Sequence, residues 1–234
     1  MSKQNSVASP IYEPKGKAKE YGDLALNIYT GCPHRCFYCY APLVLKKDKE
    51  AFHSIVEPRD GIVEATRRQL ERQKITGQTI HLCFTCDPYP TGYDSTPTRE
   101  IIKLLKEYGN HVQILTKGNG SRDFDLLDKD DWFGVTITGG ETAEKLHDLS
   151  EQLIQAKALY KINTWISFEP VIDEESVLES LRNGASAVNK VKIGKLNYHK
   201  SDIDWHNFGI EAEKICKEQG INYYIKESLR AEMS

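Results

Sequence analysis

Three cysteines lie within eight residues of one another and could bind one compact metal centre. They follow the spacing C-x3-C-x2-C, at Cys32, Cys36 and Cys39. A structural zinc site takes four protein ligands, whereas this segment offers three thiolates, with His34 placed awkwardly between two of them. Three thiolates fit a 4Fe-4S cluster that leaves one iron open to an exogenous ligand. The alternative is a zinc site that Cys83 or Cys86 completes.

The apolar periodicity around this segment predicts alternating strands and helices. The expected strands are 24–29, 80–84, 111–115, 132–138, 164–168, 187–193 and, as a last run, 221–225. The expected helices are 61–74, 98–108, 122–127, 142–160, 174–182 and 205–219. Six βα units in order predict an α/β fold, a partial (β/α)6 TIM-like barrel of parallel strands. A doubly wound open sheet is the alternative.

Length and composition limit the classes of protein. The chain has 234 residues, and 31 Lys and Arg residues stand against 34 Asp and Glu residues for a net charge of -3. No apolar run is long enough to span a membrane. We expect an N-terminal arm at 1–20, tied down near Ile11 and Tyr12, and one core domain at 21–234. The arm lacks the apolar region of a secretory signal, which predicts a cytoplasmic protein whose six cysteines are metal ligands or reactive thiols.

Polar side chains follow several of the expected strands. They are Thr85, Asp87, Lys117, Thr136, Thr138, Ser167 and Glu169. Parallel α/β folds place their chemistry at the carboxyl ends of the strands, so these residues are the candidates for a binding site. Residues two apart on a strand face the same side, which groups Thr136 with Thr138 and Ser167 with Glu169.

These motifs together resemble the radical S-adenosylmethionine (SAM) superfamily. Its signature, C-x3-C-x-aromatic-C after the first strand of a βα series, matches residues 32–39, with Tyr38 as the aromatic. Further matches follow the second, third and fifth strands, and they are Thr85-Cys86-Asp87-Pro88-Tyr89-Pro90, Leu115-Thr116-Lys117-Gly118 with Arg122-Asp123, and Phe168-Glu169-Pro170. The set resembles the spore photoproduct lyase-like branch and covers residues 24–225.

The resemblance implies a radical mechanism. The open iron of a 4Fe-4S cluster would chelate SAM, and the reduced cluster would cleave SAM to methionine and a 5'-deoxyadenosyl radical that takes hydrogen from a substrate. It also implies an electron donor of the flavodoxin or ferredoxin type. The substrate class stays open between a nucleobase, a nucleotide, a nucleic acid and a peptide. Length argues against photoproduct repair itself, because the lyases are longer and use C-terminal elements to grip DNA.

The resemblance also implies roles for individual residues. Tyr38 matches the position near the adenine, and a core tyrosine is the alternative. Many members carry Gly-Gly-Glu after the second strand, where this chain has Thr85 and Asp87, and both can accept a hydrogen bond from the SAM ammonium. Asp87 could instead cap its own turn, and Lys117, suited to the SAM carboxylate, could be a solvated surface lysine. Residues expected to meet the ribose or methionine part are Thr136, Thr138, Ser167 and Glu169.

Cys83 and Cys86 form a C-x2-C pair at the end of the second expected strand. In the spore lyases a cysteine in this region returns hydrogen to the product radical, so the resemblance implies this catalytic role for Cys86 or, failing it, Cys83. If the strand extends that far, its alternation points the two side chains to opposite sides. Buried inert thiols are the alternative for the pair, and Cys216 is expected in the core.

Two further expectations concern charge and protein class. Five basic residues without an acid lie between Glu179 and Asp202, and they are Arg182, Lys190, Lys192, Lys195 and Lys200. They could contact the phosphates of a nucleic acid or form a solvated face. The rival to an enzyme is a non-catalytic iron-sulfur protein that carries electrons or acts as a sensor. Such a protein would not need cofactor-contacting residues at the ends of other strands.

Overall fold

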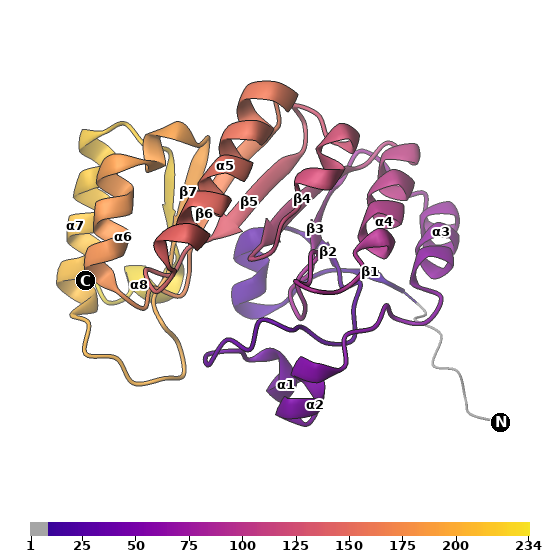
Figure 1. Ribbon diagram of the computed structural model, residues 1–234, viewed down its shortest axis with the longest axis horizontal. Helices are drawn as coiled ribbons and strands as arrows, with labels where there is room; N and C mark the ends of the chain where they lie inside the picture. The colour runs from indigo at the N-terminus through magenta and orange to yellow at the C-terminus, as the bar shows by residue number, and fades with distance from the viewer. Residues whose placement is uncertain (1–8) are drawn as a thin grey trace. The chain divides into compact units, whose positions relative to one another are not determined.

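The computed structural model describes residues 9–234, which form an α/β fold with two compact units (Figure 1). The first unit ends at Asp131 and the second begins at Trp132. Residues 1–8 of the expected arm at 1–20 lie outside the described residues. From there Ile11 and Tyr12 form strand β1 (Ile11–Tyr12), which confirms that this part of the arm is tied down.

The first unit is built on a small, mostly parallel sheet. Strand β1 pairs antiparallel with β2 (Leu24–Leu26), and β3 (Thr79–Leu82) and β4 (His111–Thr116) follow in parallel. The register pairs Leu26 with Leu82 and Leu82 with Ile114, and all three side chains are fully buried. Parallel register places them in one apolar row, and the β2, β3 and β4 carboxyl ends therefore lie at one edge of this sheet.

Helices flank the strands of the first unit. In chain order they are η1 (Gly16–Tyr21, a 3-10 helix), α1 (Ala41–Val44), α2 (Lys49–Ser54), α3 (Ile62–Gln73), α4 (Thr96–Glu107) and η2 (Ser121–Leu126, a 3-10 helix). Helix α4 buries Ile101, Ile102 and Leu105, which share one helical face. Figure 1 shows α1 and α2 next to each other, away from the neighbouring helices α3 and α4.

The second unit has a wholly parallel sheet in chain order. Its strands are β5 (Trp132–Thr136), β6 (Asn163–Phe168), β7 (Lys190–Ile193) and β8 (Tyr223–Ile225). Its helices are α5 (Ala143–Tyr160), α6 (Glu174–Asn183), η3 (Ala185–Ala187, a 3-10 helix), α7 (Trp205–Glu218) and α8 (Glu227–Arg230). Side-chain oxygens of Thr142, Asp173 and Asp204 accept backbone N–H groups at the starts of the three long helices.

Most expected elements are confirmed, and the differences have local causes. The strand expected at 24–29 ends at Leu26, and the one expected at 187–193 begins at Lys190 because the preceding residues form η3. Helices α1, α2 and α8 were not expected, because four to six residues are too few for a helical period to stand out. Cys216 is fully buried in α7, as expected. Within the described part of the chain no helix is long and apolar enough to cross a membrane.

Candidate functional site

The three cysteines lie on one loop, residues 31–40, between β2 and α1; we call it the cysteine loop. Its first residue must be glycine, because a Cβ at Gly31 would overlap the carbonyl oxygens of Phe52 and Ile55. The Cys32 N–H donates to the Phe52 carbonyl at 3.1 Å, and the His53 ring Nδ1 lies 2.8 Å from the Cys32 carbonyl oxygen. The loop is therefore anchored on the end of α2.

A second anchor holds the middle of the cysteine loop. Arg35 adopts a left-handed conformation, with φ of 51°, and its guanidinium binds both carboxylate oxygens of Glu50 at 2.7 and 2.5 Å. The Cys39 N–H donates to the Cys36 carbonyl at 3.0 Å, which closes a tight turn between two of the thiols. The segment with the spacing C-x3-C-x2-C thus forms one anchored loop, and this loop carries all three thiols.

The ionisation of these thiols fits a metal-cluster ligand set. Burial raises the pKa of Cys32, and the nearby Asp87 carboxylate raises it further. Burial also raises the pKa of Cys39, and the Cys36 charge adds to it. A thiolate is therefore disfavoured here unless a nearby cation neutralises its charge, as the iron ions of an iron-sulfur cluster would. Cys32 and Cys39 are two such thiols, Cys36 lies on the same loop, and all six cysteines are free of disulfides.

Cys83 and Cys86 face each other rather than opposite sides. Strand β3 ends at Leu82, and Cys83 has a left-handed backbone with φ of 73°, so the condition for strand alternation is not met. Cys83 and Cys86 lie close enough for each thiol to alter the pKa of the other, and the Cys86 sulfur accepts the Tyr29 N–H at 3.4 Å. The Tyr29 contact ties the Cys86 sulfur to the segment that follows β2.

The two thiols of this pair differ in acidity. Burial raises the pKa of Cys83, and its hydrogen bond to Cys86 raises it further. Burial opposes ionisation of Cys86 too, but the hydrogen bonds from Cys83 and Tyr29 and the charge of Arg59 outweigh it and lower the Cys86 pKa. Cys86 is therefore the more acidic thiol of the pair.

Asp87 joins three segments of the first unit. Its Oδ1 accepts the Tyr89 N–H at 2.8 Å and the Thr116 hydroxyl at 2.5 Å, and its Oδ2 accepts the Lys117 N–H at 2.8 Å. The Tyr89 contact is the turn cap that the sequence analysis gave as the alternative role of Asp87. The other two contacts join the loop after β3 to the end of β4, so the carboxylate does more than cap its own turn.

Two buried polar atoms beside Asp87 have no hydrogen-bond partner among the described residues. His34 Nε2 lies 3.1 Å from Asp87 Oδ2 but is too poorly aligned for a hydrogen bond. The Thr85 hydroxyl is also buried and unpaired, although its N–H is held by the Asn27 side chain at 2.9 Å. Such atoms are rare in folded proteins and are commonly satisfied by a ligand or water.

Lys117 and Tyr38 also belong to this group. The Lys117 ammonium lies 5.8 Å from the centre of the Tyr38 ring, so the end of β4 reaches the cysteine loop. The next residue, Gly118, must be glycine because a Cβ there would overlap the Tyr89 carbonyl oxygen. The first unit thus brings together the cysteine loop and four predicted cofactor residues, Tyr38, Thr85, Asp87 and Lys117.

Behind this group a buried carboxylate fixes the loop after β3. Asp123 is fully buried, accepts the Tyr89 hydroxyl at 3.1 Å and binds the Arg99 guanidinium at 2.9 Å. Asp123 belongs to the Arg122-Asp123 motif, which the sequence matched without assigning a role. The structure makes it a positioning residue for Tyr89, and through Tyr89 for the turn that Asp87 caps.

The second unit brings two of its predicted residues together on its own sheet. Thr136 of β5 pairs in register with Ser167 of β6, so their side chains lie side by side. Just beyond the strand ends, the Thr138 hydroxyl donates to Glu141 at 2.7 Å, and Glu169 binds Lys226 at 2.7 Å.

The sequence did not predict either of these partners, Glu141 or Lys226. The only signal that could have indicated Lys226 was its place directly after the last apolar run. Its side chain is 2% exposed, so burial makes this ion pair an integral part of the unit.

The five basic residues of the second unit have separate environments. Arg182 pairs with Glu211, Lys195 pairs with Glu232, and Lys190 lies 4.6 Å from the centre of the Trp132 ring. Lys192 is buried, whereas Lys200 is exposed. Lys192 also lies 5.8 Å from the centre of the Trp165 ring and 5.5 Å from that of Tyr224, so four of the five have partners within the unit.

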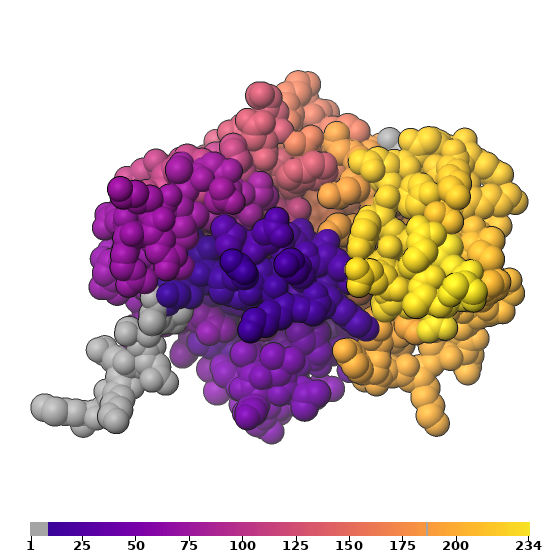
Figure 2. All heavy atoms as spheres, turned by 180° about the vertical axis from the view of Figure 1, so that it is seen from behind, coloured from indigo at the N-terminus to yellow at the C-terminus, as the bar shows by residue number. Residues whose placement is uncertain are grey.

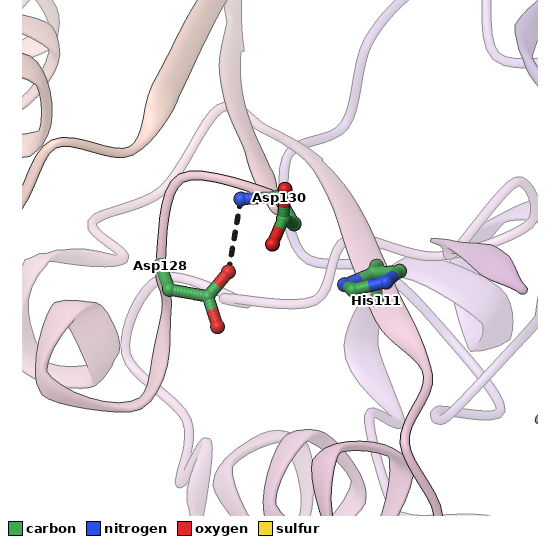
Figure 3. A group of neighbouring side chains, drawn as sticks. All are labelled: His111, Asp128 and Asp130. Atoms are coloured by element: carbon green, nitrogen blue, oxygen red, sulfur yellow. Dashed lines mark hydrogen bonds between the residues drawn. The ribbon is translucent and has the colours of Figure 1, made fainter. Parts of the chain in front are cut away.

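A separate group of possible metal ligands lies in the first unit (Figure 3). Among the described residues, His111, Asp128 and Asp130 offer donor atoms within 4.8 Å of one another. Asp128 accepts the Asp130 N–H at 2.9 Å and binds Lys106 at 2.8 Å, while Lys106 also binds the buried Asp131. The positive charge beside these carboxylates is thus already supplied by Lys106.

Comparison with known proteins identifies the fold. No protein-family model and no curated protein sequence matches the chain significantly. Solved structures of spore photoproduct lyase do match. The complex with a dinucleoside spore photoproduct has a TM-score of 0.64 at 12% identity, over 91% of this chain and 78% of the lyase.

Two further lyase structures match in the same way. A cysteine-to-serine variant has a TM-score of 0.66 at 11% identity, over 92% of this chain and 79% of the lyase. A variant with bound AdoMet and dinucleoside spore photoproduct has a TM-score of 0.57 at 11% identity, over 88% of this chain and 63% of the lyase. The fold is therefore that of these lyases, which confirms the expected partial (β/α)6 barrel class.

Proposed function

We propose that this protein is a radical SAM enzyme of the spore photoproduct lyase-like type. The observation that carries the proposal is the loop of three thiols at the carboxyl end of β2, beside two buried polar atoms without a hydrogen-bond partner among the described residues, in a fold shared with an AdoMet-binding lyase. Cys32, Cys36 and Cys39 would hold a 4Fe-4S cluster, which supplies the electron that cleaves SAM to a 5'-deoxyadenosyl radical.

The residues of the first unit would orient the cofactor. Thr85 and Asp87 offer oxygens to an ammonium group, and the Lys117 ammonium suits a carboxylate. Tyr38, with Lys117 near its ring, offers an aromatic surface to the adenine. Thr136, Thr138, Ser167 and Glu169 of the second unit remain predicted cofactor contacts on the strength of the sequence resemblance.

The Cys83 and Cys86 pair would return hydrogen to a substrate or product radical. The supporting observation is that the two thiols lie close together, with the pKa of Cys83 raised by burial and the pKa of Cys86 lowered by its surroundings. Deuterium oxide should then label the product. Anaerobic turnover by Cys83→Ala and by Cys86→Ala, each with the cysteine loop intact, tests this. Unchanged rate and unchanged deuterium content in both variants would make the pair structural.

The substrate class follows from the neighbours and is also a proposal. Two of the lyase structures compared above carry a dinucleoside photoproduct, so we propose a nucleobase within a nucleotide or nucleic acid as the substrate. An electron donor of the flavodoxin or ferredoxin type would supply the reducing equivalent.

Anaerobic reconstitution with iron and sulfide tests the proposed function. We expect about four irons per chain and, with SAM and dithionite, release of 5'-deoxyadenosine and methionine. Cys36→Ala should lose the cluster, whereas the control Cys216→Ala, altered in the core of the second unit, should keep it. Bound zinc without iron would refute the proposal. A stable cluster that never yields 5'-deoxyadenosine would instead favour the iron-sulfur carrier.

A further inference from the structure

The segment that carries the cysteines also exposes large apolar side chains. Phe37, Leu43 and Val44 are 53%, 82% and 62% exposed, and they lie within eight residues of one another. We call these three residues the α1 patch. The buried Ala41 and Pro42 hold helix α1 against the protein, so Leu43 and Val44 are fixed on its outside. Large apolar side chains that are exposed on one short segment commonly mark a protein contact.

The surroundings of the α1 patch are basic, although the whole chain is acidic. Residues 35–50 contain four basic and two acidic side chains, in a chain of net charge -3. Both acidic groups are engaged locally, since Glu50 binds Arg35 and Asp48 accepts the Ala51 N–H at the start of α2. Lys46 and Lys49 are exposed. An apolar centre with a cationic rim fits an acidic protein surface.

The position of the α1 patch indicates what such a partner would do. Phe37 directly follows Cys36, and Val44 lies five residues after Cys39. Helix α1 lies beside α2, whose end anchors the cysteine loop, and Figure 2 shows this purple segment on the surface of the first unit. A protein docked on the α1 patch therefore lies against the loop that would hold the cluster.

We propose that the α1 patch is the docking surface for a small acidic one-electron carrier protein, which reduces the cluster through the cysteine loop. The inference rests on the proposed function. The carrier gives one electron to the oxidised cluster and is itself oxidised by one electron, and no bond forms between the proteins. A polyanion such as a nucleic acid fits less well, because the centre of the patch is apolar and offers its phosphates no partner.

The test compares a protein donor with a small donor on the reconstituted enzyme. A flavodoxin in its hydroquinone state serves as the probe, and cluster reduction is followed anaerobically by stopped-flow absorbance. We expect Leu43→Ser/Val44→Ser and, separately, Lys46→Glu/Lys49→Glu to slow reduction by flavodoxin by about tenfold or more. For the wild-type protein, reduction should slow as salt is raised, because attraction between the surface charges is screened.

A matched control lies on α5. Leu159 is 71% exposed and is followed two residues later by Lys161, which has a left-handed backbone like that of Lys46. Leu159→Ser/Lys161→Glu should be reduced by flavodoxin at the wild-type rate. All variants should form 5'-deoxyadenosine normally with dithionite, which needs no docking surface.

The outcomes separate the docking surface from the function. Wild-type rates of reduction by flavodoxin in both α1-patch variants would overturn the proposal, as would a defect that appears equally with dithionite in both. Loss of self-association or of binding to anionic lipid vesicles, with flavodoxin reduction intact, would assign the patch to another contact. Failure of the wild-type enzyme to cleave SAM with dithionite would refute the proposed function itself.

Discussion

At the scale of residues, the chemistry of the first unit depends on a few buried groups with several contacts each. Asp87 accepts three hydrogen bonds from three different residues, and His34 approaches it from the cysteine loop. Cys83 and Cys86 lie close together, and the pKa of Cys83 is raised while that of Cys86 is lowered. In both cases a side chain acquires its properties from neighbours on other segments, because burial makes each missing or added contact expensive.

Asp87→Asn should destabilise the protein and weaken SAM binding. The amide keeps the shape but replaces one acceptor oxygen with a donor, which must face the Thr116 hydroxyl or the Lys117 N–H. We expect a loss of about 1–3 kcal/mol in the free energy of unfolding, measured by denaturant titration. The exposed Asp130→Asn is the control and should change it little. Equal stability of the two variants would contradict the role assigned to Asp87.

Cys86 should react with iodoacetamide before Cys83, with a midpoint pH below that of an ordinary thiol. A lowered pKa means that more thiolate is present at a given pH, so alkylation begins at lower pH. Arg59→Gln removes a positive charge that favours this thiolate and should slow Cys86 alkylation at neutral pH, by up to about tenfold for one pKa unit.

Mass spectrometry of the cysteine peptides from the reconstituted protein measures this order. Arg68→Gln is the control, because Arg68 is exposed on α3 and is not among the charges acting on Cys86. Faster alkylation of Cys83 than of Cys86 would show that the proton lies on the other sulfur.

At the scale of elements, loops rather than helices or strands carry the candidate site. Strands β2, β3 and β4 end within a few residues of the cysteine loop, Asp87 and Lys117, so their parallel register brings these loops to one edge. Close backbone approach between loops then fixes their geometry. Gly31 against α2 and Gly118 against the turn after β3 are the two positions where a side chain has no room.

Gly118→Ala should separate the loops after β3 and β4. A Cβ at this position overlaps the Tyr89 carbonyl oxygen, which belongs to rigid backbone, so the loops must move apart. We expect the free energy of unfolding to fall by about 1–3 kcal/mol, as is usual for overpacking, and SAM affinity to fall with it. Gly140→Ala is the matched control, since its Cβ would lie at an ordinary 3.7 Å from its nearest neighbour. Identical behaviour of the two variants would contradict the close approach.

At the scale of the whole molecule, the two units carry different chemistry. Five of the six cysteines belong to the first unit, together with His34 and Thr85, whose buried side-chain atoms have no hydrogen-bond partner among the described residues. The second unit holds the Lys226–Glu169 ion pair and the paired Thr136 and Ser167 on its own sheet. The first unit therefore contains the whole proposed cluster site.

SAM should stabilise the reconstituted protein against heat. A ligand that binds only the folded state adds about 2.7 kcal/mol at a concentration about 100 times its Kd. Differential scanning calorimetry with and without SAM measures this effect. Cys36→Ala, which should lack the cluster, is the control and should show no shift in Tm. An equal shift in both proteins would mean that SAM binds without the cluster.

Much of this molecule could be predicted from its sequence because the relevant patterns are local. The spacing of Cys32, Cys36 and Cys39 lies within one loop, and the apolar periods of α3, α5 and β6 lie within single segments. Short elements such as α1 were missed for the same reason, since they are shorter than the pattern needed to detect them. The strand-end positions of Asp87 and Lys117 followed from the order of the elements.

Only the tertiary structure decided which groups are partners. The contacts of Asp87 with Thr116 and of Glu169 with Lys226 join residues 29 and 57 positions apart, where no local pattern reaches. Cys83 faces Cys86 because its backbone turns left-handed directly after β3, against the alternation that the sequence suggested. The sequence by itself determined which chemical groups this protein has and in which order, whereas burial and chain folding determined which of them share a proton or a charge.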